Sequence, residues 1–590
     1  MKLAEEKVLF LDCQTTGATP KTAHVLELGW SLSGVSDSKP TIVNRILLLP
    51  DDQELPLRIQ RITGITAADM ATAHRPADVV AELMGQIGEG PFGPVRFVVA
   101  HYAQFEESFV GQLFADHAVD APFKFICTCQ IAKRLYPDLP SRAIRALGGY
   151  FGLSLSEMKR SSCHVEATFF IWQRLLSDLS ALGIEDSDQL LEWLSKPLVK
   201  TQAKKNAFAI PMERLKRLDL PDRPGIYRML NAEGKILYVG KATSLKSRVN
   251  SYFRGRKGKD SKTKELISQI YDVAVIVVAT PLEAALLETD LIKQHDPPYN
   301  RALRERGRFL SFYNHDFTES SLNQNANFKF GPFVSDQFKP LLDLLQALQS
   351  GSRPPELFWG LVGEEVIGAA FALFLQNKML VDYSLQQMTA RKFLALGMVL
   401  LRAEVNGLRA LKREEEQLLR LLALQSQLVD GTESQLALVQ PEGQPDEQPD
   451  DQADEDDEER ELDENDVLEM IYGILMRSAK MHLQAKKLTI LLNSGIEFFD
   501  GERRSLTFRR GSLVAADYQC RSVDSDCSWS GLDINTYDRM RVLLTELARV
   551  SSKNQVSSNG QVTIVSPFQA SEKTLLDRHI DLMSKLSPRR

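Results

Sequence analysis

The stretch that decides the fold in the middle of this 590-residue chain is GIYRMLNAEGKILYVGKA, residues 225–242. Two apolar runs flank the polar segment 231–234, Asn-Ala-Glu-Gly, and this arrangement is typical of a β-hairpin. Apolar periodicity predicts helices over 244–253 and 281–295 and a strand over 273–279. The segment therefore predicts a small α/β unit in which a hairpin is followed by a helix, a strand and a helix.

Side chains suited to phosphate chemistry gather in this unit. They are Tyr227, Tyr238, Lys241, Arg248, Tyr252, Glu288 and Asn300. Cleaving a phosphodiester requires an activated water, a metal ion and donors for the developing charge. A lone carboxylate suits Mg²⁺, which keeps several waters, and a guanidinium can bind phosphate oxygens in a fork. Each residue alone also fits a packing or solvated role, so the prediction depends on the whole set.

Two longer stretches, YVGKATSLKSRVNSYF at 238–253 and EAALLETDLIKQHDPPYN at 283–300, give this set a family resemblance. They resemble the GIY-YIG nucleases, and most closely the UvrC-like and Cho-like branch. The resemblance implies a nuclease domain over 215–303 that uses the seven residues above. It also implies that Glu288 holds a Mg²⁺ or Mn²⁺ ion and that Tyr227 is the general base, assisted by Tyr238. A free tyrosine titrates near pH 10, so the base role requires a lowered pKa.

The first 180 residues alternate apolar strand-like runs with helical ones, which predicts another α/β unit. FLDCQTTG at 10–17, AHYAQFE at 100–106 and SSCHVEAT at 161–168 resemble the motifs of DnaQ-like, DEDD-type 3′–5′ exonucleases. The resemblance implies an RNase H-like fold in which Asp12, Glu106 and Glu166 occupy metal-ligand positions.

The same motifs depart from the exonuclease pattern. Neutral Gln14 stands where the family has an acid, and Glu106 and Glu166 are each one methylene longer than aspartate. Ser161 takes the place of the catalytic histidine, and His164 is expected on another part of the helix entry. Two-metal chemistry needs carboxylates clustered around ions about 4 Å apart. We therefore expect a degenerate domain that positions DNA without cutting it.

The remaining chain completes a predicted α/β multidomain protein. We expect a linker at 181–214, a UvrC-like connector at 304–390, a long helix at 391–430, an acidic disordered linker at 431–466 and an α+β module at 467–590. Within the module we expect a helix at 467–483 and a strand at 488–492. The apolar spacing from Leu394 to Leu408 fits either a helix packed on its own domain or a partner helix.

The net charge of −7 conceals an uneven distribution. Residues 442–466 hold 15 acidic residues and one arginine, whereas residues 201–310 hold 22 basic and 12 acidic residues. Local charge decides where a phosphate backbone docks, so the basic middle of the chain is compatible with DNA. The acidic run is either a spacer or a mimic of nucleic acid. The absence of a long apolar run and of a signal-peptide pattern predicts a cytoplasmic protein with no membrane partner.

These features predict a metal-dependent endonuclease that makes single-strand incisions in damaged or structured DNA. The resemblance implies a place in nucleotide excision repair, with damage-recognition proteins as partners. One alternative is an enzyme in which both nuclease domains work. Another is a non-catalytic DNA-binding scaffold that recruits partners through the acidic run and the long helix.

Overall fold

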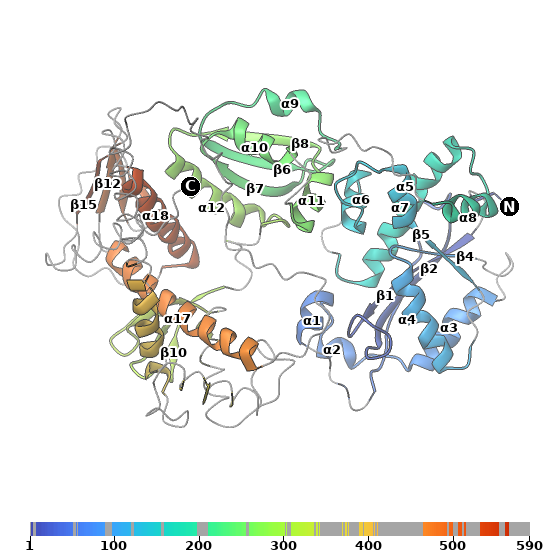
Figure 1. Cartoon of the computed structure of the whole chain (residues 1–590), viewed down its shortest axis with the longest axis horizontal. Helices are drawn as coiled ribbons and strands as arrows, with labels where there is room; N and C mark the ends of the chain where they lie inside the picture. The colour runs from blue at the N-terminus through green and yellow to red at the C-terminus, as the bar shows by residue number, and fades with distance from the viewer. Residues whose placement is uncertain are drawn as a thin grey trace, which may run out of the picture. The chain divides into compact units, whose positions relative to one another are not determined.

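The computed structural model divides into two compact units, residues 1–304 and 305–590 (Figure 1). Unit 1 is described from residue 2 apart from 4–6, 51–52, 54, 56, 89–96, 120–122, 155–157, 198–209, 255–258, 301–302 and 304. Unit 2 is described at 308–335, 338–339 and 342, at scattered positions from 369 to 410, and at 464–492, 495–499, 505–509, 512–514, 532–553 and 561–565. Residues 431–463 of the predicted acidic linker lie outside the described residues.

A five-stranded mixed sheet forms the N-terminal half of unit 1. Its strands are β1 (Lys7–Thr15), β2 (Val25–Gly34), β3 (Val43–Ile46), β4 (Phe97–Ala100) and β5 (Lys124–Cys127). The order is β3-β2-β1-β4-β5, with β2 antiparallel to β1 and to β3, and with β4 parallel to both β1 and β5. The central strand β1 is apolar on both faces, as a strand covered on both sides must be.

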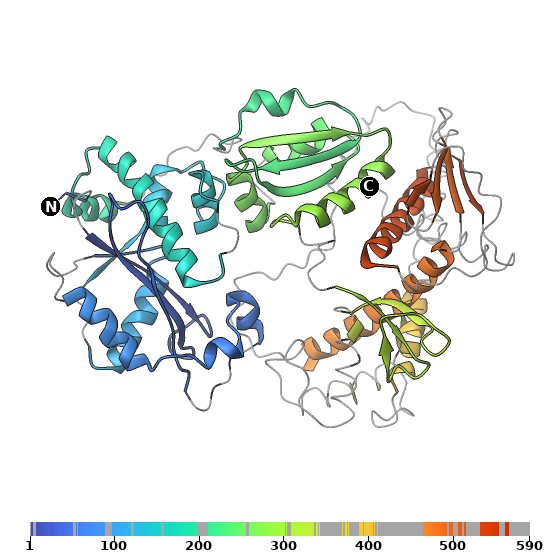
Figure 2. The ribbon, with the colours of Figure 1, turned by 180° about the vertical axis from the view of Figure 1, so that it is seen from behind.

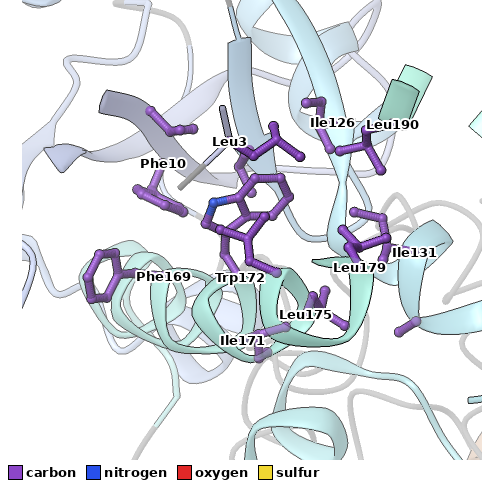
Figure 3. Close-up of a cluster of buried hydrophobic side chains, with 14 of the residues drawn as sticks. Leu3, Phe10, Ile126, Ile131, Phe169, Ile171, Trp172, Leu175, Leu179 and Leu190 are labelled. Carbon is purple, nitrogen blue, oxygen red and sulfur yellow. The ribbon is translucent and has the colours of Figure 1, made fainter. Parts of the chain in front are cut away.

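Helices cover both faces of this sheet (Figure 2). The helices of the region are α1 (Leu57–Thr63), α2 (Ala67–Met70), α3 (Pro76–Gly88), α4 (Gln104–Asp116), α5 (Thr128–Leu135), α6 (Ile144–Tyr150) and α7 (Ser161–Ala181). Trp172 points from α7 toward Leu3 and Phe10 (Figure 3), and all three are buried in one cluster. The other face packs against α3 and α4 through Val80 and Phe109. The predicted α/β unit is confirmed.

The first core extends beyond residue 180. Helix α8 (Ser187–Ser195) lies in the segment expected as a linker, and its Leu190 is fully buried in the cluster of Trp172. Asp186 begins this helix with a capping box completed by Gln189. The short helix α9 (Arg214–Leu218) precedes the first strand of the next domain.

The middle domain has the predicted hairpin, helix, strand and helix, with one helix, α11 (Ser261–Ser268), that was not predicted. Its elements are β6 (Gly225–Leu230), β7 (Ile236–Ala242), α10 (Leu245–Phe253), α11 (Ser261–Ser268), β8 (Asp272–Val277) and α12 (Pro281–His295). The antiparallel sheet has the order β7-β6-β8. Val249 of α10 packs in one cluster with Tyr227, whereas Ala284 of α12 packs in another with Ile226, the neighbouring residue of β6. Because successive strand residues point to opposite faces, the two helices sandwich the sheet.

Unit 2 contains two small sheets and two long helices. They are β9 (Leu310–Tyr313), β10 (Ser320–Ser321) and β11 (Phe330–Val334), then α17 (Glu464–Leu492), β12 (Gly495–Phe499), β13 (Ser505–Arg509), β14 (Ser512–Val514), α18 (Ile534–Lys553) and β15 (Gln561–Val565). The orders are β10-β9-β11 and β14-β13-β12-β15. The strand expected at 488–492 is wrong, because α17 continues through it with Leu488, Leu491 and Leu492 buried.

Residues 394–404 are helical, and Leu401 packs against Met476 and Ala479 of α17. This part of the expected long helix therefore packs within its own unit. Of residues 411–430 the structure describes nothing. None of the described helices has a span long and apolar enough to cross a membrane.

A buried ion pair in unit 2 joins Arg308 to Asp538 of α18. Arg308 donates to both carboxylate oxygens of Asp538, at 3.3 and 3.2 Å, and the Asp538 side chain is fully buried. Arg308→Met leaves that charge without its guanidinium, so we expect a loss of about 3–5 kcal/mol in the free energy of unfolding. Urea unfolding of the full chain measures it. The double variant Arg308→Met/Asp538→Asn should recover much of the loss, and a single variant as stable as the parent would contradict the prediction.

Candidate active site

Three tyrosines from the middle domain form a cluster beside strand β7. The Oη atoms of Tyr227 on β6 and Tyr252 on α10 lie 3.0 Å apart, at hydrogen-bond distance. Ring centroids are separated by 6.0 Å between Tyr227 and Tyr238, and by 6.3 Å between Tyr238 and Tyr252. Tyr227 is fully buried and the other two are half-buried. The structure thus brings together three of the side chains expected at the site.

Gly240 makes room for this cluster. It lies opposite Tyr227 in the β6–β7 register. A Cβ at residue 240 would lie 2.4 Å from Tyr227 Oη and 2.8 Å from Tyr238 Cε1, which is closer than real Cβ atoms approach other atoms. Glycine is therefore required here by the packing of the two phenol rings.

The hydroxyls of Tyr227 and Tyr238 are held in their neutral form. Burial raises the pKa of Tyr227 well above its ordinary value, and the neighbouring tyrosines raise it further. Burial likewise raises the pKa of Tyr238, with contributions from Tyr252 and Glu288. These directions are opposite to the lowered pKa that the general-base role requires. Arg248 is the neighbour that lowers both pKa values.

Arg248 lies against the tyrosines from helix α10. Its guanidinium carbon is 5.5 Å from the centroid of the Tyr252 ring, in a cation–π contact. Burial alone would lower the pKa of Arg248, but the neighbouring tyrosine hydroxyls raise it, so the side chain stays charged. Ser244 caps the start of α10 by accepting from the N–H of Ser247, which sets the helix that presents Arg248.

Glu288 reaches the same strand from helix α12. Its Oε1 accepts a hydrogen bond of 3.0 Å from the backbone N–H of Lys241, and its Oε2 lies 3.9 Å from Lys241 Nζ. Its side chain is 15% exposed, so the carboxylate remains accessible to a small ion. Within the described residues no three His, Cys, Asp or Glu side chains are grouped so as to hold a metal ion. A single carboxylate with open coordination positions suits Mg²⁺, and the donor set therefore fits that ion.

Asn300 holds the strand instead of facing the tyrosines. Its Oδ1 accepts from the N–H of Val239 and its Nδ2 donates to the carbonyl of Val239, both at 2.9 Å. Val239 lies between Tyr238 and Gly240, so Asn300 fixes the position of both. Its expected catalytic role becomes, in this geometry, a positioning role.

Replacing Asn300 should destabilise the domain. Asn300→Ala leaves the buried N–H and carbonyl of Val239 unpaired, and we expect a loss of about 2–4 kcal/mol in the free energy of unfolding. Asn300→Asp keeps the acceptor for the N–H and should lose less. Urea unfolding of the three proteins measures the difference. Equal stability of the alanine variant and the parent would contradict the role of Asn300 in holding Val239.

In the exonuclease-like region, Asp12, expected at a metal-ligand position, pairs with side chains of the protein. Both carboxylate oxygens of Asp12, at the end of β1, accept from neighbouring side chains: Gln14 Nε2 lies 3.2 Å from Oδ2 and His164 Nδ1 lies 3.0 Å from Oδ1. The charge and hydrogen bond of Asp12 raise the pKa of His164 against the opposing effect of burial. Burial, together with the charge of Asp12, raises the pKa of Glu106. His164, three residues after Ser161, lies against Asp12, a contact that the sequence did not predict.

Ser161 and Glu166 do not join this group. Ser161 donates from its N–H and Oγ to Glu27 Oε2, at 2.8 and 2.7 Å. Glu166 follows His164 by two positions on α7 and is turned by about 200° around the helix axis. No sequence pattern indicated Glu27, which is fully buried and pairs with Arg160 and Asn44.

Comparisons with known proteins agree with these two regions. Residues 223–301 match the family model described as a UvrC-like GIY-YIG domain. The UvrABC system protein C of Psychrobacter sp. (strain PRwf-1) is 52% identical over 99 residues, which is 16% of each chain. A "Putative bifunctional exonuclease/endonuclease protein" of Mycobacterium tuberculosis is 28% identical over 312 residues, covering 51% of this chain and 45% of that one.

A solved structure of exonuclease X with 5′-overhanging duplex DNA is 19% identical, covers 32% of this chain and 99% of that chain, and has a TM-score of 0.24. The matches span less than half the length of these two curated relatives. The mycobacterial relative is named for an exonuclease and an endonuclease together, and residues 223–301 of this chain match the UvrC-like GIY-YIG model.

Proposed function

We propose that this protein is a metal-dependent DNA endonuclease that makes single-strand incisions through its GIY-YIG domain. The observation that carries the proposal is the convergence of Glu288 from α12 and Arg248 from α10 on the tyrosine cluster of the hairpin and α10. A scaffold that only binds DNA has no need for a carboxylate, a guanidinium and three phenols around one strand.

The proposed roles follow from the contacts. Glu288 is the residue that would hold Mg²⁺ or Mn²⁺, and the ion would supply charge neutralisation at the phosphate and an acidic bound water. Arg248 and Lys241 bind the scissile phosphate, the first as a fork and the second as a point charge. Tyr227 is the proposed general base, and in that role the metal ion and Arg248 would have to offset the pKa that burial raises. Its Oη is 3.0 Å from Tyr252 Oη.

The net positive charge of the segment that contains this site favours a nucleic-acid substrate. Residues 201–310 hold 22 basic and 12 acidic residues, and the acidic run begins at residue 442, in the other unit of the chain. A basic surface binds the phosphate backbone whatever the sequence of the DNA. We propose damaged or structured DNA as the substrate and excision-repair damage-recognition proteins as partners, in the cytoplasm, on the basis of the UvrC-like domain.

The exonuclease-like region is proposed to position DNA without trimming it. Supporting observations are the neutral Gln14 beside Asp12 and the engagement of both Asp12 oxygens. The metal-ligand roles expected for Asp12, Glu106 and Glu166 do not fit this arrangement, because Asp12 already accepts from two side chains and Glu166 lies on another side of α7.

Metal removal tests the endonuclease directly. Supercoiled plasmid, intact or carrying ultraviolet damage, should be converted to nicked circles by the full chain with MgCl₂, and excess EDTA should abolish conversion. Adding the damage-recognition proteins of an excision-repair system controls for a requirement for loading. Undiminished nicking in EDTA, or none under all these conditions, would refute the proposal.

A further inference from the structure

Helix α6 of the exonuclease-fold region packs against helix α11 of the nuclease domain, within the same compact unit. At the end of α11, Ser268 and Gln269 are 0% and 5% exposed. The N–H of Ser141 donates to Ser268 Oγ at 3.2 Å. Just after α11, Tyr271 Oη donates to the backbone carbonyl of Tyr150. The two regions of unit 1 therefore share a hydrogen-bonded interface.

Gly149 of α6 lies directly against Gln269. A Cβ on residue 149 would lie 2.3 Å from Gln269 Cγ and 2.6 Å from Gln269 Cδ, which is closer than real Cβ atoms approach other atoms. Gly149 lies within a regular helix, so its backbone conformation does not call for glycine, whereas the space taken by Gln269 does. Because Gln269 is buried, its side chain has little room to move aside.

Gln269 in turn holds the ring of Tyr299. Its Nε2 donates to Tyr299 Oη and to the backbone carbonyl of Glu265, and Tyr299 Oη donates to Glu265 Oε1. Tyr299 is 7% exposed, and its N–H donates to the carbonyl of Leu237 on β7 at 3.1 Å. Arg145 Nε of α6 lies 3.8 Å from Glu265 Oε1. Helix α6 thus contacts both of the side chains that bond the Tyr299 hydroxyl.

The same segment bonds the outer edge of strand β7. Asn300 follows Tyr299 in the chain and bonds both the N–H and the carbonyl of Val239. Strand β7 is the first strand in the order β7-β6-β8, so these bonds and the one to Leu237 lie on the side that no neighbouring strand of this sheet covers. Tyr238, between Leu237 and Val239, belongs to the tyrosine cluster.

We propose that the exonuclease-fold region is a positioning part of the endonuclease, in which Gly149 of α6 keeps Gln269 against Tyr299 and so fixes the edge strand that carries Tyr238. The consequence for nicking rests on the proposed endonuclease, whereas the support of β7 does not. Small displacements of the reacting groups slow a reaction strongly, while affinity for DNA comes largely from contacts to its phosphates. Gly149 and Gln269 should therefore affect the rate and not the binding of DNA.

Gly149→Ala in the full chain tests the proposal. The new methyl group should displace Gln269, so the nicking rate at saturating plasmid should fall by about tenfold or more, while the plasmid concentration that gives half the maximal rate stays unchanged. Hydrogen–deuterium exchange of the peptide 236–242 should become faster, because the bonds on the edge of β7 open more often. Mass spectrometry measures this exchange without any need for nuclease activity.

Gly148→Ala is the matched control on the same helix. The three atoms nearest to a Cβ on residue 148 all belong to Leu153, in the exonuclease-fold region itself, at 3.3 to 4.0 Å. This variant adds a methyl group to α6 beside Leu153 and not beside Gln269, so its nicking rate and its exchange at 236–242 should match those of the parent. Equal changes in the Gly148→Ala and Gly149→Ala proteins would overturn the proposal.

Gln269→Ala shows whether the two residues act through one route. It loses the bond to Tyr299 Oη, so it should slow nicking and speed up exchange at 236–242, and it carries the test if Gly149→Ala does not fold. Adding Gly149→Ala should change neither quantity further, because the methyl group then has space. Additive effects, or exchange in either single variant that matches the parent, would overturn the proposal. If the parent does not nick DNA, the proposed function fails and the exchange still decides whether α6 supports β7.

Discussion

Glu288→Gln is expected to lower the rate of metal-dependent nicking by roughly 10²- to 10³-fold or more, because the carboxylate that would hold the ion is lost from the tyrosine site. The substitution preserves shape. The amide Oε1 of glutamine can still accept the 3.0 Å hydrogen bond from the Lys241 N–H, so strand β7 and helix α12 should stay together. The melting temperature of the variant should therefore match that of the parent, and single-turnover nicking of supercoiled plasmid measures the loss.

Asp290→Asn is the matched control for this variant. Asp290 lies on α12 two residues after Glu288 and so points about 200° away around the helix. It also exchanges a carboxylate for an amide of the same shape, and nicking should persist. Loss of activity in Asp290→Asn alone, with Glu288→Gln active, would contradict the assignment of the site to Glu288.

Gly240→Ala is expected to reduce both stability and nicking. The new Cβ would meet Tyr227 Oη at 2.4 Å and Tyr238 Cε1 at 2.8 Å, and the fully buried Tyr227 has little freedom to move away. Overpacking of this kind typically costs about 1–3 kcal/mol in the free energy of unfolding. Moving the phenols also shifts them relative to Arg248, so the nicking rate should fall by at least about tenfold.

The control for this prediction is Gly85→Ala. Gly85 lies in helix α3, and a Cβ there would meet nothing within 4 Å. Alanine in such a position should stabilise the chain by about 0.5–1 kcal/mol. Urea unfolding and plasmid nicking of both variants separate the crowding at Gly240 from a general effect of adding a methyl group. A Gly240→Ala protein as stable and active as the parent would contradict the described packing.

Local signals were sufficient to predict the middle domain. The Asn-Ala-Glu-Gly turn marks the hairpin, and Thr280, Pro281 and Glu283 at the start of α12 form a capping box with proline at the first position. These are short-range effects, and they act wherever the rest of the chain lies. The bounds of α10, β8 and α12 therefore agree closely with the structure, whereas α11 was not predicted. The joint pattern of tyrosine, arginine and glutamate residues indicated side chains that the structure brings close together.

Elements decided by tertiary packing were predicted less well. Residues 488–492, Leu-Thr-Ile-Leu-Leu, look equally like a short buried strand, and only their packing in unit 2 makes them the end of α17. Leu190 signals a core residue only once the position of α8 against α7 is known. The contact between His164 and Asp12 was missed for a related reason, since an alignment of motifs does not show which helix position faces Asp12. The Asp186–Gln189 capping box was a local signal that could have revealed α8.

The most direct test follows both regions in one reaction. A supercoiled plasmid is incubated with the full chain and MgCl₂ beside a single strand labelled at its 3′ end. We expect the parent to nick the plasmid and to leave the 3′ label in place, and we expect Glu288→Gln to leave both the plasmid and the label intact. Nicking by Glu288→Gln at the rate of the parent, or loss of the label that is abolished by Asp12→Ala, would contradict these expectations.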